Sequence, residues 1–386
     1  MIPHETIDNI CATVNPPQKL ETTEYQADGE FPIIDQSQSD VAGYTNNIAS
    51  TLPPDNYILF GDHTCTLKFI NKRFAQGADG LKILKCANGV DPKYIYYAMK
   101  SLNFKTERYK RHWSEFKQLS VPIPSLDTQH KIAGILSALD DKIELNDKIN
   151  RKLNELARLI YDYWFVQFDF PDENGRPYRT SGGKMVYNDP LKHEIPEGWA
   201  VKPLDKILAF NRGTEPGSKA YLDTKKNDTC IKFHRVGDML GDCTTWIDSN
   251  KFKLYRVKPG DVLVSFDATI GRIATCVDGA ISGGIRHIYD PDKNISDAFI
   301  WQLFQSQKIQ DQMLQFVSGR GSSLAHAGGV IKELAIPYNM ATIQKYQSIV
   351  NPMYQLYINN QLESRQLAQL RDWLLPMLMN GQVVVN

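Results

Sequence analysis

The sequence predicts an α+β protein in which two mixed α/β domains are joined by two long antiparallel helices. An internal pseudo-two-fold duplication is expected to relate the two halves. Three observations support this architecture: a heptad of apolar residues that occurs twice, a constant offset between its copies, and similar β-prone and helical runs before each copy. The 386 residues suffice for two or three domains with several hydrophobic cores.

The first heptad steps alternately by four and three residues from Ile132 to Trp164, and the second steps in the same way from Tyr346 to Leu378. Every member of the second copy lies 214 residues after its counterpart. A repeat of 3.5 residues places apolar side chains on one face, as in a coiled coil. The residues expected to pack the helix pair are Ile132, Leu136, Leu139, Ile143, Asn146, Leu153, Ile160, Tyr346, Val350, Met353, Tyr357, Asn360, Leu367 and Leu374.

Each heptad run corresponds to a helix of roughly 50 Å, and the most economical partner for each helix is the other one. In an antiparallel pair, Asn146 and Asn360 lie near the middle, where paired amides would fix the register. Asp127 or Thr128 can cap the first helix, and Asn339 or Thr342 the second. Alternatively, both are ordinary core helices, and Pro352 kinks the second helix or marks its true start.

Runs 57–62 and 262–267 are β-prone, and each is followed by an aromatic-rich helical run, 94–99 and 299–304. Glycine, proline and charged residues after Phe170 indicate a surface linker. We therefore expect a first domain over residues 1–122, a long helix over 123–169, a linker over 170–194, a second domain over 195–336, and a second long helix over 337–386.

The composition and motifs argue against several classes of protein. No stretch is apolar enough to span a membrane, and the start, Met1 to Glu5, lacks the pattern of a secretion signal. Six dispersed cysteines are typical of a reduced cytoplasmic protein. A phosphate-binding Gly-Lys-Ser/Thr loop and a His-Glu-x-x-His motif are both missing, and Gln18 replaces the aromatic of an Asn-Pro-Pro-Tyr/Phe methyltransferase loop. We expect no catalysis, no metal and no bound cofactor.

Basic residues are concentrated locally, although 44 basic and 44 acidic residues cancel overall. The segment from Lys100 to Lys117 holds six basic and two acidic residues among aromatic ones. This pattern suits binding of nucleic-acid phosphates, but a solvated helix end with aromatics packed on the domain explains it equally well. The candidate nucleic-acid contacts in both domains are His63, Thr64, Lys68, Arg73, Arg108, Tyr109, Lys110, Arg111, His112, Arg212, Lys219, Tyr221, His234, Arg235, Arg272, Arg286, Arg320, Ser322 and Ser323.

One family shares the sequence of the first long helix. The segments 121–126, 132–146 and 163–168 resemble the central conserved region of the DNA-specificity (S) subunits of type I restriction-modification systems. Ile195-Pro196-Glu197-Gly198-Trp199 resembles the opening of the second target-recognition domain of such a subunit, and residues 367–381 resemble its distal conserved region. The first domain lacks this opening, which leaves open whether its N-terminal edge is trimmed or completed by another segment.

The resemblance implies a non-catalytic, cytoplasmic subunit in which each domain reads one half of a bipartite, asymmetric site on double-stranded DNA. The helices would set the spacer, at most about fifteen base pairs, and would dock two methyltransferase (M) subunits. S-adenosylmethionine is then expected on these partners, and ATP and Mg are expected on the partner subunits of the complex, which include restriction (R) subunits. The alternatives are a coiled-coil structural adaptor with two protein-binding domains, and a methyltransferase or nuclease in its own right.

Overall fold

The computed structural model describes residues 2–77, 79–104, 110–318, 327–383 and 385. The chain divides into two compact units. The first unit comprises Met1–Glu144 and Arg365–Asn386, and the second comprises Leu145–Ser364. Each long helix therefore contributes one segment to each unit.

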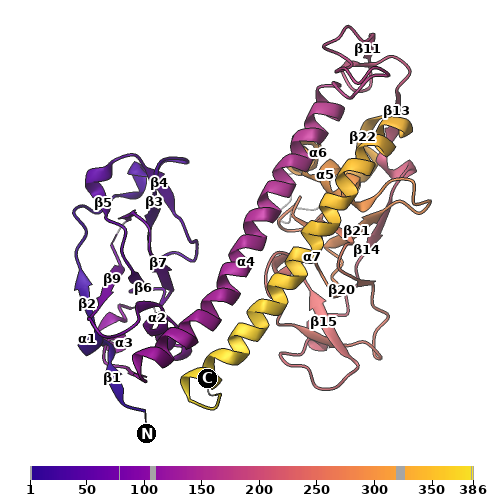
Figure 1. Ribbon diagram of the computed structural model, residues 1–386. Coiled ribbons are helices and arrows are strands. Elements are labelled where there is room, and N and C mark those ends of the chain that lie inside the picture. The colour runs from indigo at the N-terminus through magenta and orange to yellow at the C-terminus, as the bar shows by residue number, and fades with distance from the viewer. Residues whose placement is uncertain (1, 78, 105–109, 319–326, 384, 386) are drawn as a thin grey trace. The chain divides into compact units, whose positions relative to one another are not determined.

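The first unit contains two four-stranded sheets, ordered β2-β9-β6-β7 and β4-β3-β8-β5, and a separate pair, β1-β10 (Figure 1). The strands β3 and β8 run parallel, whereas the other neighbours are antiparallel. The strands are β1 (His4–Thr6), β2 (Cys11–Val14), β3 (Phe31–Ile34), β4 (Gly43–Thr45), β5 (Thr51–Leu52), β6 (Tyr57–Gly61), β7 (Leu67–Ile70), β8 (Phe74–Gln76), β9 (Leu81–Cys86) and β10 (Ser120–Pro122). The short helices are α1 (Ile7–Ile10), α2 (Pro92–Ser101) and α3 (Trp113–Phe116).

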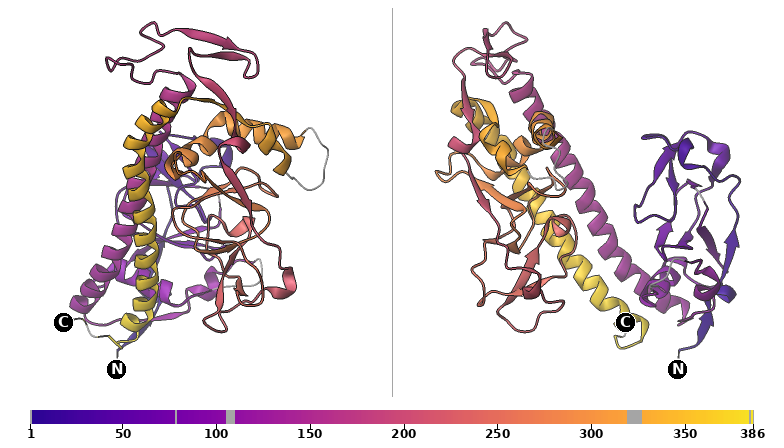
Figure 2. Two further views of the ribbon diagram at one scale, coloured as in Figure 1. Left: turned by 90° about the vertical axis from the view of Figure 1, so that its right-hand side faces the viewer. Right: turned by 180° about the vertical axis from the view of Figure 1, so that it is seen from behind.

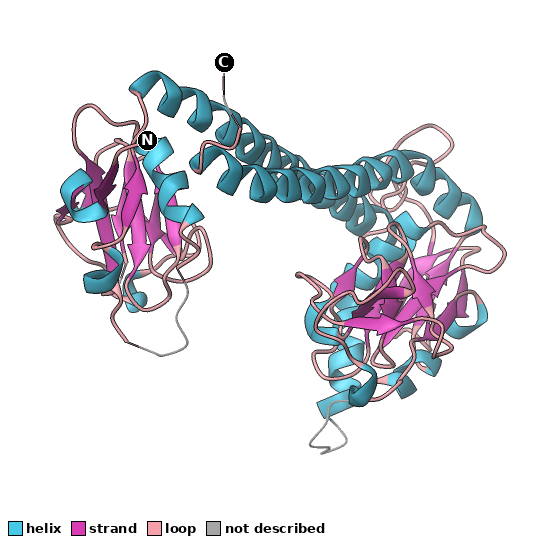
Figure 3. Cartoon of the chain, turned by 90° about the horizontal axis from the view of Figure 1, so that it is seen from below, coloured by secondary structure: helices cyan, strands magenta, loops and turns pink. Residues whose placement is uncertain are grey.

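The second unit repeats this strand order. Its sheets are ordered β14-β21-β18-β19 and β16-β15-β20-β17, with the pair β13-β22, and here β15 and β20 run parallel. Figure 3 shows the strands in magenta and the helices in cyan. The strands are β13 (Ala200–Pro203), β14 (Ala209–Arg212), β15 (Cys230–His234), β16 (Trp246–Asp248), β17 (Arg256–Val257), β18 (Val262–Ser265), β19 (Ile273–Ala274), β20 (Gly279–Ile281), β21 (Ile285–Tyr289) and β22 (Ala335–Tyr338). Its shorter helices are α5 (Asp297–Gln305) and α6 (Gln307–Ser318). The predicted duplication is confirmed and extends to every one of these sheets.

The structure also bears on the N-terminal edge of the first domain. Strand β1 pairs with β10 just as β13 pairs with β22. Each strand from β13 to β22 thus has a counterpart from β1 to β10. The second unit additionally carries a hairpin, β11 (Met185–Asn188) with β12 (His193–Pro196), which begins inside the predicted linker 170–194 and ends at the predicted start of the second domain.

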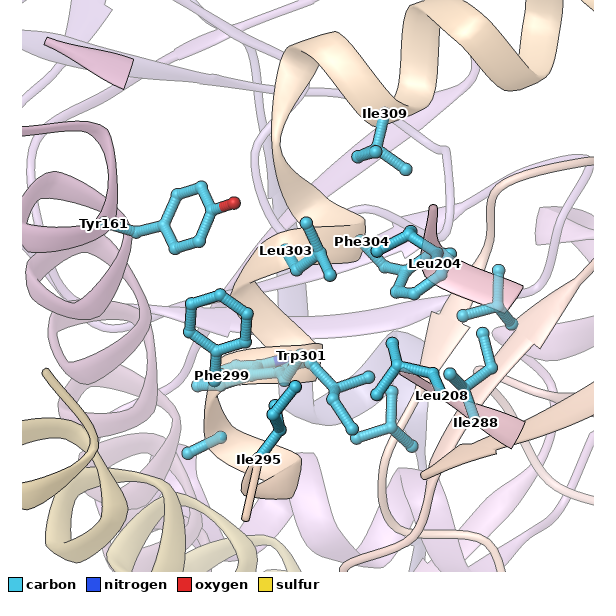
Figure 4. Close-up of a cluster of buried hydrophobic side chains, with 14 of the residues drawn as sticks. Tyr161, Leu204, Leu208, Ile288, Ile295, Phe299, Trp301, Leu303, Phe304 and Ile309 are labelled. Atoms are coloured by element: carbon cyan, nitrogen blue, oxygen red, sulfur yellow. The ribbon is translucent and has the colours of Figure 1, made fainter. Parts of the chain in front are cut away.

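The core of the second unit lies between its strands and its long-helix segments. Helix α5 begins after Ser296, whose Oγ accepts from the Phe299 N–H at 3.4 Å. Figure 4 shows Phe299, Leu303 and Phe304 of this helix among Leu204, Leu208 and Ile288, with Tyr161 projecting from α4 toward them. Burying this apolar face is what holds the helices to the sheet.

The two long helices are α4 (Leu126–Tyr161), continued by a π-helical turn over Asp162–Val166, and α7 (Met340–Met379). Ser125 Oγ accepts from the Thr128 N–H at 3.4 Å, and Asn339 Oδ1 accepts from the Thr342 N–H at 3.0 Å. The cap of the second helix is therefore Asn339, one of the two residues predicted. The prediction for the first was wrong, because the helix begins before Asp127 and its cap is Ser125, 214 residues before Asn339.

Pro352 lies inside α7 and does not mark its start. A proline in a helix interior removes one backbone hydrogen bond but can be held by packing on its neighbours. Here Val350 and Tyr354 on either side of it are buried in the core of the second unit. The helix is thus continuous from Met340, and the alternative that Pro352 marks its true start is wrong.

Segments of α4 and α7 pack antiparallel within each unit. In the second unit, Asn150 Nδ2 donates to the Tyr357 carbonyl at 3.1 Å, and the Tyr346 hydroxyl donates to the Ala157 carbonyl at 3.0 Å. A later residue of α4 therefore meets an earlier residue of α7, and the two helices run side by side over this stretch (Figure 2). In the first unit, an Arg371 guanidinium nitrogen lies 2.6 Å from Asp140 Oδ1.

The predicted seam residues are all buried or half-buried, but they do not pack only on the opposite helix. Ile132 and Leu136 share a core cluster with Leu375 of α7 and with Tyr94 and Tyr97 of α2. Tyr346 and Val350 likewise join the core of the second unit. Each helix segment thus packs on the other long helix, as in a coiled coil, and also on the core of its own unit. The coiled-coil alternative and the core-helix alternative are therefore each correct in part.

The central asparagines are paired differently from the expectation. Asn146 Nδ2 donates to Glu363 Oε2 at 2.8 Å and to Ser364 Oγ at 3.3 Å, and it reaches only the backbone carbonyl of Asn360, at 3.5 Å. Because facing residues in an antiparallel pair are staggered, the side-chain amide opposite Asn360 belongs to Asn150. The amide pair is therefore Asn150 with Asn360.

Candidate nucleic-acid interface

In the first unit, Asp62 anchors the segment that carries two candidate DNA contacts, Lys110 and Arg111. This aspartate follows β6 and is 3% exposed. Its Oδ1 accepts from the backbone N–H groups of His112 at 2.9 Å and Trp113 at 2.8 Å, and its carbonyl oxygen accepts from the His112 N–H at 2.9 Å. A carboxylate suits these donors, which open helix α3. Lys110 and Arg111 are exposed immediately before this anchor.

His63 and Thr64 lie beside the same segment. His63 Nδ1 is 3.2 Å from the Lys110 carbonyl oxygen. The His63 backbone N–H donates to Gln36 Oε1 at 3.2 Å, and Thr64 Oγ1 donates to the Gln36 carbonyl at 2.6 Å. The structure therefore brings His63, Thr64, Lys110 and Arg111 together at the ends of β6 and the start of β9.

Other candidates in the first unit are engaged inside the domain. Lys68 Nζ donates to the Asp35 carbonyl at 3.0 Å, and burial lowers the pKa of its ammonium group. Arg73 donates to Thr51 Oγ1 at 3.0 Å. The side chain of His112 is fully buried and offers no surface to a ligand. Arg108 and Tyr109 lie outside the described residues.

The aromatic residues of the same segment pack on the domain. The ring of Phe116 stacks on Phe60 at 4.2 Å between centroids, and Phe104 meets Phe116 edge-on at 5.4 Å. Trp113 lies 5.8 Å from Phe60. For these aromatic residues, the packing interpretation of the sequence is therefore the right one. Among the described residues of the segment, Lys110 and Arg111 are exposed, and so is Glu115, which pairs with Lys110 Nζ at 2.5 Å.

The second unit brings Arg212, Arg272 and Arg286 to the ends of β14, β18 and β21. Arg212 and Arg286 are directly opposite each other on β14 and β21. Arg212 Nε donates to the Gly283 carbonyl at 2.8 Å, and Arg272 donates to the Val236 carbonyl at 3.3 Å. Glycine is needed in this turn, because a Cβ on Gly283 would lie 2.9 Å from Cγ of Glu215.

The charges of this arginine cluster are only partly compensated. Like charges directly opposite each other on antiparallel strands repel. Burial and the neighbouring Arg212 lower the pKa of the Arg286 guanidinium, whereas Asp267 raises it. Arg286 also lies over the Phe266 ring at 5.4 Å. Closely spaced guanidinium groups of this kind are well suited to bind phosphate oxygens.

The remaining candidates of the second unit are more dispersed. Arg235 lies over the ring of Tyr221 at 5.9 Å and pairs with Asp238 at 3.1 Å, and Lys219 is exposed nearby in sequence. His234 is buried, with Nε2 3.1 Å from the Asp278 carbonyl oxygen, which indicates a structural role. Arg320, Ser322 and Ser323 lie outside the described residues.

Sequence reasoning missed the acidic residues that shape both sites. Asp62 and Asp267 each follow a predicted strand, and their common position after the two runs was the available signal. Glu215 had no such signal, because its role as acceptor from the Gly283 N–H at 2.7 Å joins residues far apart in sequence.

A cavity of about 710 Å³ in the second unit was also missed, and it differs in charge from the arginine cluster. It is lined by Arg256, Lys258 and Lys293 but also by Asp261 and Asp297. Burial and the nearby Asp261 raise the pKa of Asp297 to about 6. This mixed lining does not favour a polyanion.

Among the residues that the structure describes, no helix is long and apolar enough to cross a membrane. Nor does the described part of the chain gather three His, Cys, Asp or Glu residues in an arrangement that could hold a metal ion.

Comparison with known proteins shows which proteins the chain is similar to. Residues 6–155 match the family model described as the type I restriction modification DNA specificity domain. The chain is similar to the MjaIX specificity subunit of Methanocaldococcus jannaschii, with 28% identity over 326 residues that cover 78% of this chain and 71% of the relative. The chain is thus similar to the specificity subunits of type I restriction-modification systems.

The chain is also similar to the HindI specificity subunit of Haemophilus influenzae, with 23% identity over 364 residues that cover 77% of this chain and 78% of the relative. Its fold resembles the crystal structure of the type I S subunit from M. genitalium, with a TM-score of 0.60, 19% identity, and coverage of 98% and 96% of the two chains. Because these relatives are specificity subunits, the basic clusters of this chain are candidates for recognition surfaces.

Proposed function

We propose that this chain is a specificity subunit that reads a bipartite sequence of double-stranded DNA, one half with each of its two strand-rich domains. The observation that carries the proposal is the position of the two basic clusters. In the first unit, His63 and Thr64 follow β6, and Gly80 precedes β9. At the equivalent strand ends in the second unit, Asp267 follows β18, and Gly284 precedes β21. Because β6 and β9 correspond to β18 and β21, the same end of the same fold carries a basic cluster in both copies.

In this proposal, residues 1–122 and 195–336 are the two recognition domains, and 170–194 links the first long helix to the second domain. Lys110 and Arg111 serve the first domain, and Arg212, Arg272 and Arg286 serve the second. Arginine and lysine on phosphates fix the position of the protein, while an arginine that reaches a guanine edge contributes sequence specificity. The paired helices set the spacer between the half-sites.

Two equivalent exposed apolar patches support docking of two copies of one partner. The first patch, in the first unit, is Ile135, Leu370 and Trp373, and the second patch, in the second unit, is Ile349, Leu156 and Leu159. These six side chains are between 38% and 64% exposed. The offset of 214 relates Ile135 to Ile349, Leu156 to Leu370 and Leu159 to Trp373. Large apolar side chains left exposed at equivalent positions of both units are candidates for a protein interface.

We infer that the partners are two methyltransferase subunits, and that restriction subunits join the complex. S-adenosylmethionine, ATP and Mg are then bound by these partners rather than by this chain, and the assembly works in the cytoplasm. Replacing Leu159 by Glu should release one methyltransferase copy and replacing Trp373 by Glu the other. Native mass spectrometry of the purified complex reads this stoichiometry directly, and two copies retained in both variants would refute the docking sites.

Footprinting of the complex on its target DNA tests the reading function. Two protected patches separated by an unprotected gap are expected, with an affinity that falls steeply as salt rises. One continuous patch would contradict two separate readers. Affinity without a salt slope would instead favour the alternative of a structural adaptor with protein-binding domains.

A further inference from the structure

A second, smaller cavity lies in the second unit beside the end of α4. Its volume is about 290 Å³, enough for one or two large side chains. Buried apolar residues form its floor, namely Tyr161, Phe165, Phe168, Leu303 and Ile309. Figure 4 shows Tyr161 projecting from α4 toward Leu303 and Ile309, which come from α5 and α6. The core thus leaves an apolar recess where these three helices meet.

The mouth of the cavity is basic. Arg179, His193 and Lys308 line it together with one acidic residue, Glu194, which lies 3.8 Å from Arg179. His193 Nδ1 is 2.9 Å from the Glu194 carbonyl oxygen and Nε2 is 3.0 Å from Lys308 Nζ. The imidazole therefore donates from Nδ1 and accepts from the lysine at Nε2, which leaves an ammonium group at the mouth. Burial lowers the pKa of Lys308, so an anionic partner there would be favoured.

The cavity continues the exposed apolar stripe of α4. Leu159, Tyr163 and Val166 follow one another at intervals of four and three residues, and all three are exposed. Val166 also lines the cavity. A helix lying on this stripe would therefore reach the mouth with its next anchoring side chain.

We propose that this cavity receives an aromatic or large aliphatic side chain, flanked by a carboxylate, from the partner protein that covers the second patch. The inference rests on the docking proposed above and adds the chemistry of the contacting segment. The apolar floor takes the anchor, and Lys308 with Arg179 takes the carboxylate. A second copy of this chain fits less well, because an isologous contact would place the same basic mouth on both sides.

The first unit offers a different environment at the corresponding place. The offset of 214 relates Phe165 to Met379 and Phe168 to Gln382, and the described residues of the first unit have no hairpin corresponding to β11–β12. The two partner copies should therefore bind with unequal affinity, the tighter one on the second unit.

The test titrates the full-length chain with the methyltransferase subunit and follows both binding steps by native mass spectrometry. The Lys308→Glu variant should weaken the tighter step by about tenfold or more and leave the weaker step unchanged. Lys308→Arg should retain the tighter step, and Lys332→Glu, an exposed lysine of the same unit outside the cavity, should change neither step. Equal steps in the unaltered protein, or an unchanged tighter step in Lys308→Glu, would overturn the inference while leaving the docking proposal intact.

A small-molecule probe tests binding in the cavity independently of binding of the methyltransferase subunit. By calorimetry on the full-length chain, 4-phenylbutyrate should bind the unaltered protein, bind Lys308→Glu at least about tenfold more weakly, and outcompete its uncharged analogue 4-phenylbutanol. No difference between acid and alcohol would overturn the basic mouth as the specificity element, whether or not a methyltransferase subunit binds. Self-association of the chain that disappears in Lys308→Glu would overturn the assignment in favour of a second copy.

Discussion

Asn360 donates from Nδ2 to Oδ1 of Asn150 at 3.0 Å inside the helix pair of the second unit. The duplication relates Asn360 to Asn146 and Asn150 to Ser364, and Asn146 indeed donates to Ser364 Oγ at 3.3 Å. The two bonds are images of each other under the pseudo-two-fold relation. Both side chains of each pair are buried or half-buried, so a shifted register would leave amides without partners.

Removing one amide of this pair should destabilise the protein, because the other amide stays buried without its hydrogen bond. We expect Asn360→Leu alone to lower the free energy of unfolding by about 1–3 kcal/mol, because the buried Asn150 amide loses a bond. The double variant Asn150→Leu and Asn360→Leu should be less destabilised than the sum of the single variants. Urea unfolding of the four proteins measures the coupling, and strictly additive effects would show that the pair is not coupled.

The two recognition clusters should serve different half-sites. Arg111→Ala is expected to weaken reading of the half-site bound by the first domain by about 1–3 kcal/mol, and Arg212→Ala to do the same for the second. Methylation rates on substrates altered in one half at a time separate the two effects. A loss for both halves in either variant would indicate a folding or assembly defect.

Asp62 should act as a positioning residue for Arg111. Asp62→Ala removes the acceptor for two backbone N–H groups and is expected to reduce reading of the first half-site only. Asp62→Asn keeps an acceptor oxygen and should recover part of the function. Hydrogen exchange of the His112 and Trp113 amides provides the structural readout, since it should speed up in Asp62→Ala. Slow exchange together with lost reading would contradict a positioning role.

The helix pair should act as a ruler. Deleting one heptad at the same level of α4 and α7 shortens each helix by roughly 10 Å, equivalent to about three base pairs. The recognised spacer should shorten accordingly while both half-sites stay the same. Sequencing of methylated adenines in cells that carry the complete system reads the spacer, and an unchanged spacer would show that the helices do not set it.

Asp297 should make the free energy of unfolding depend on pH, in a direction that follows from its raised pKa. Its pKa is about 6 in the folded protein against 3.8 as the ordinary value. A raised pKa in an acid means that ionisation opposes folding, so this unfavourable contribution is full above pH 6 and disappears as the pH falls toward 3.8. Asp297→Asn should therefore raise the free energy of unfolding by up to about 3 kcal/mol at pH 8 and hardly at pH 4. Thermal unfolding at both pH values measures it, and an equal gain at both would disprove the assignment.

The sequence by itself determined the long helices, the duplication and the resemblance to specificity subunits. The heptad from Ile132 and its copy from Tyr346 are visible because helical packing imposes a short, local period on the chain. The duplication that this constant offset indicates also holds for the strands, since both halves have the same strand order. The central segment around Ile132 to Asn146 was specific enough to indicate the family.

Only the tertiary structure decided which side chains meet. Asn150 rather than Asn146 faces the amide of Asn360, because the stagger of an antiparallel pair is not encoded in either helix alone. Lys68 and His112 are engaged or buried within the domain, whereas Arg212 and Arg286, 74 residues apart, lie opposite each other across two strands. Such contacts depend on strand register and on loop closure between distant segments. They therefore cannot be predicted from the type of a residue and its neighbours in the sequence.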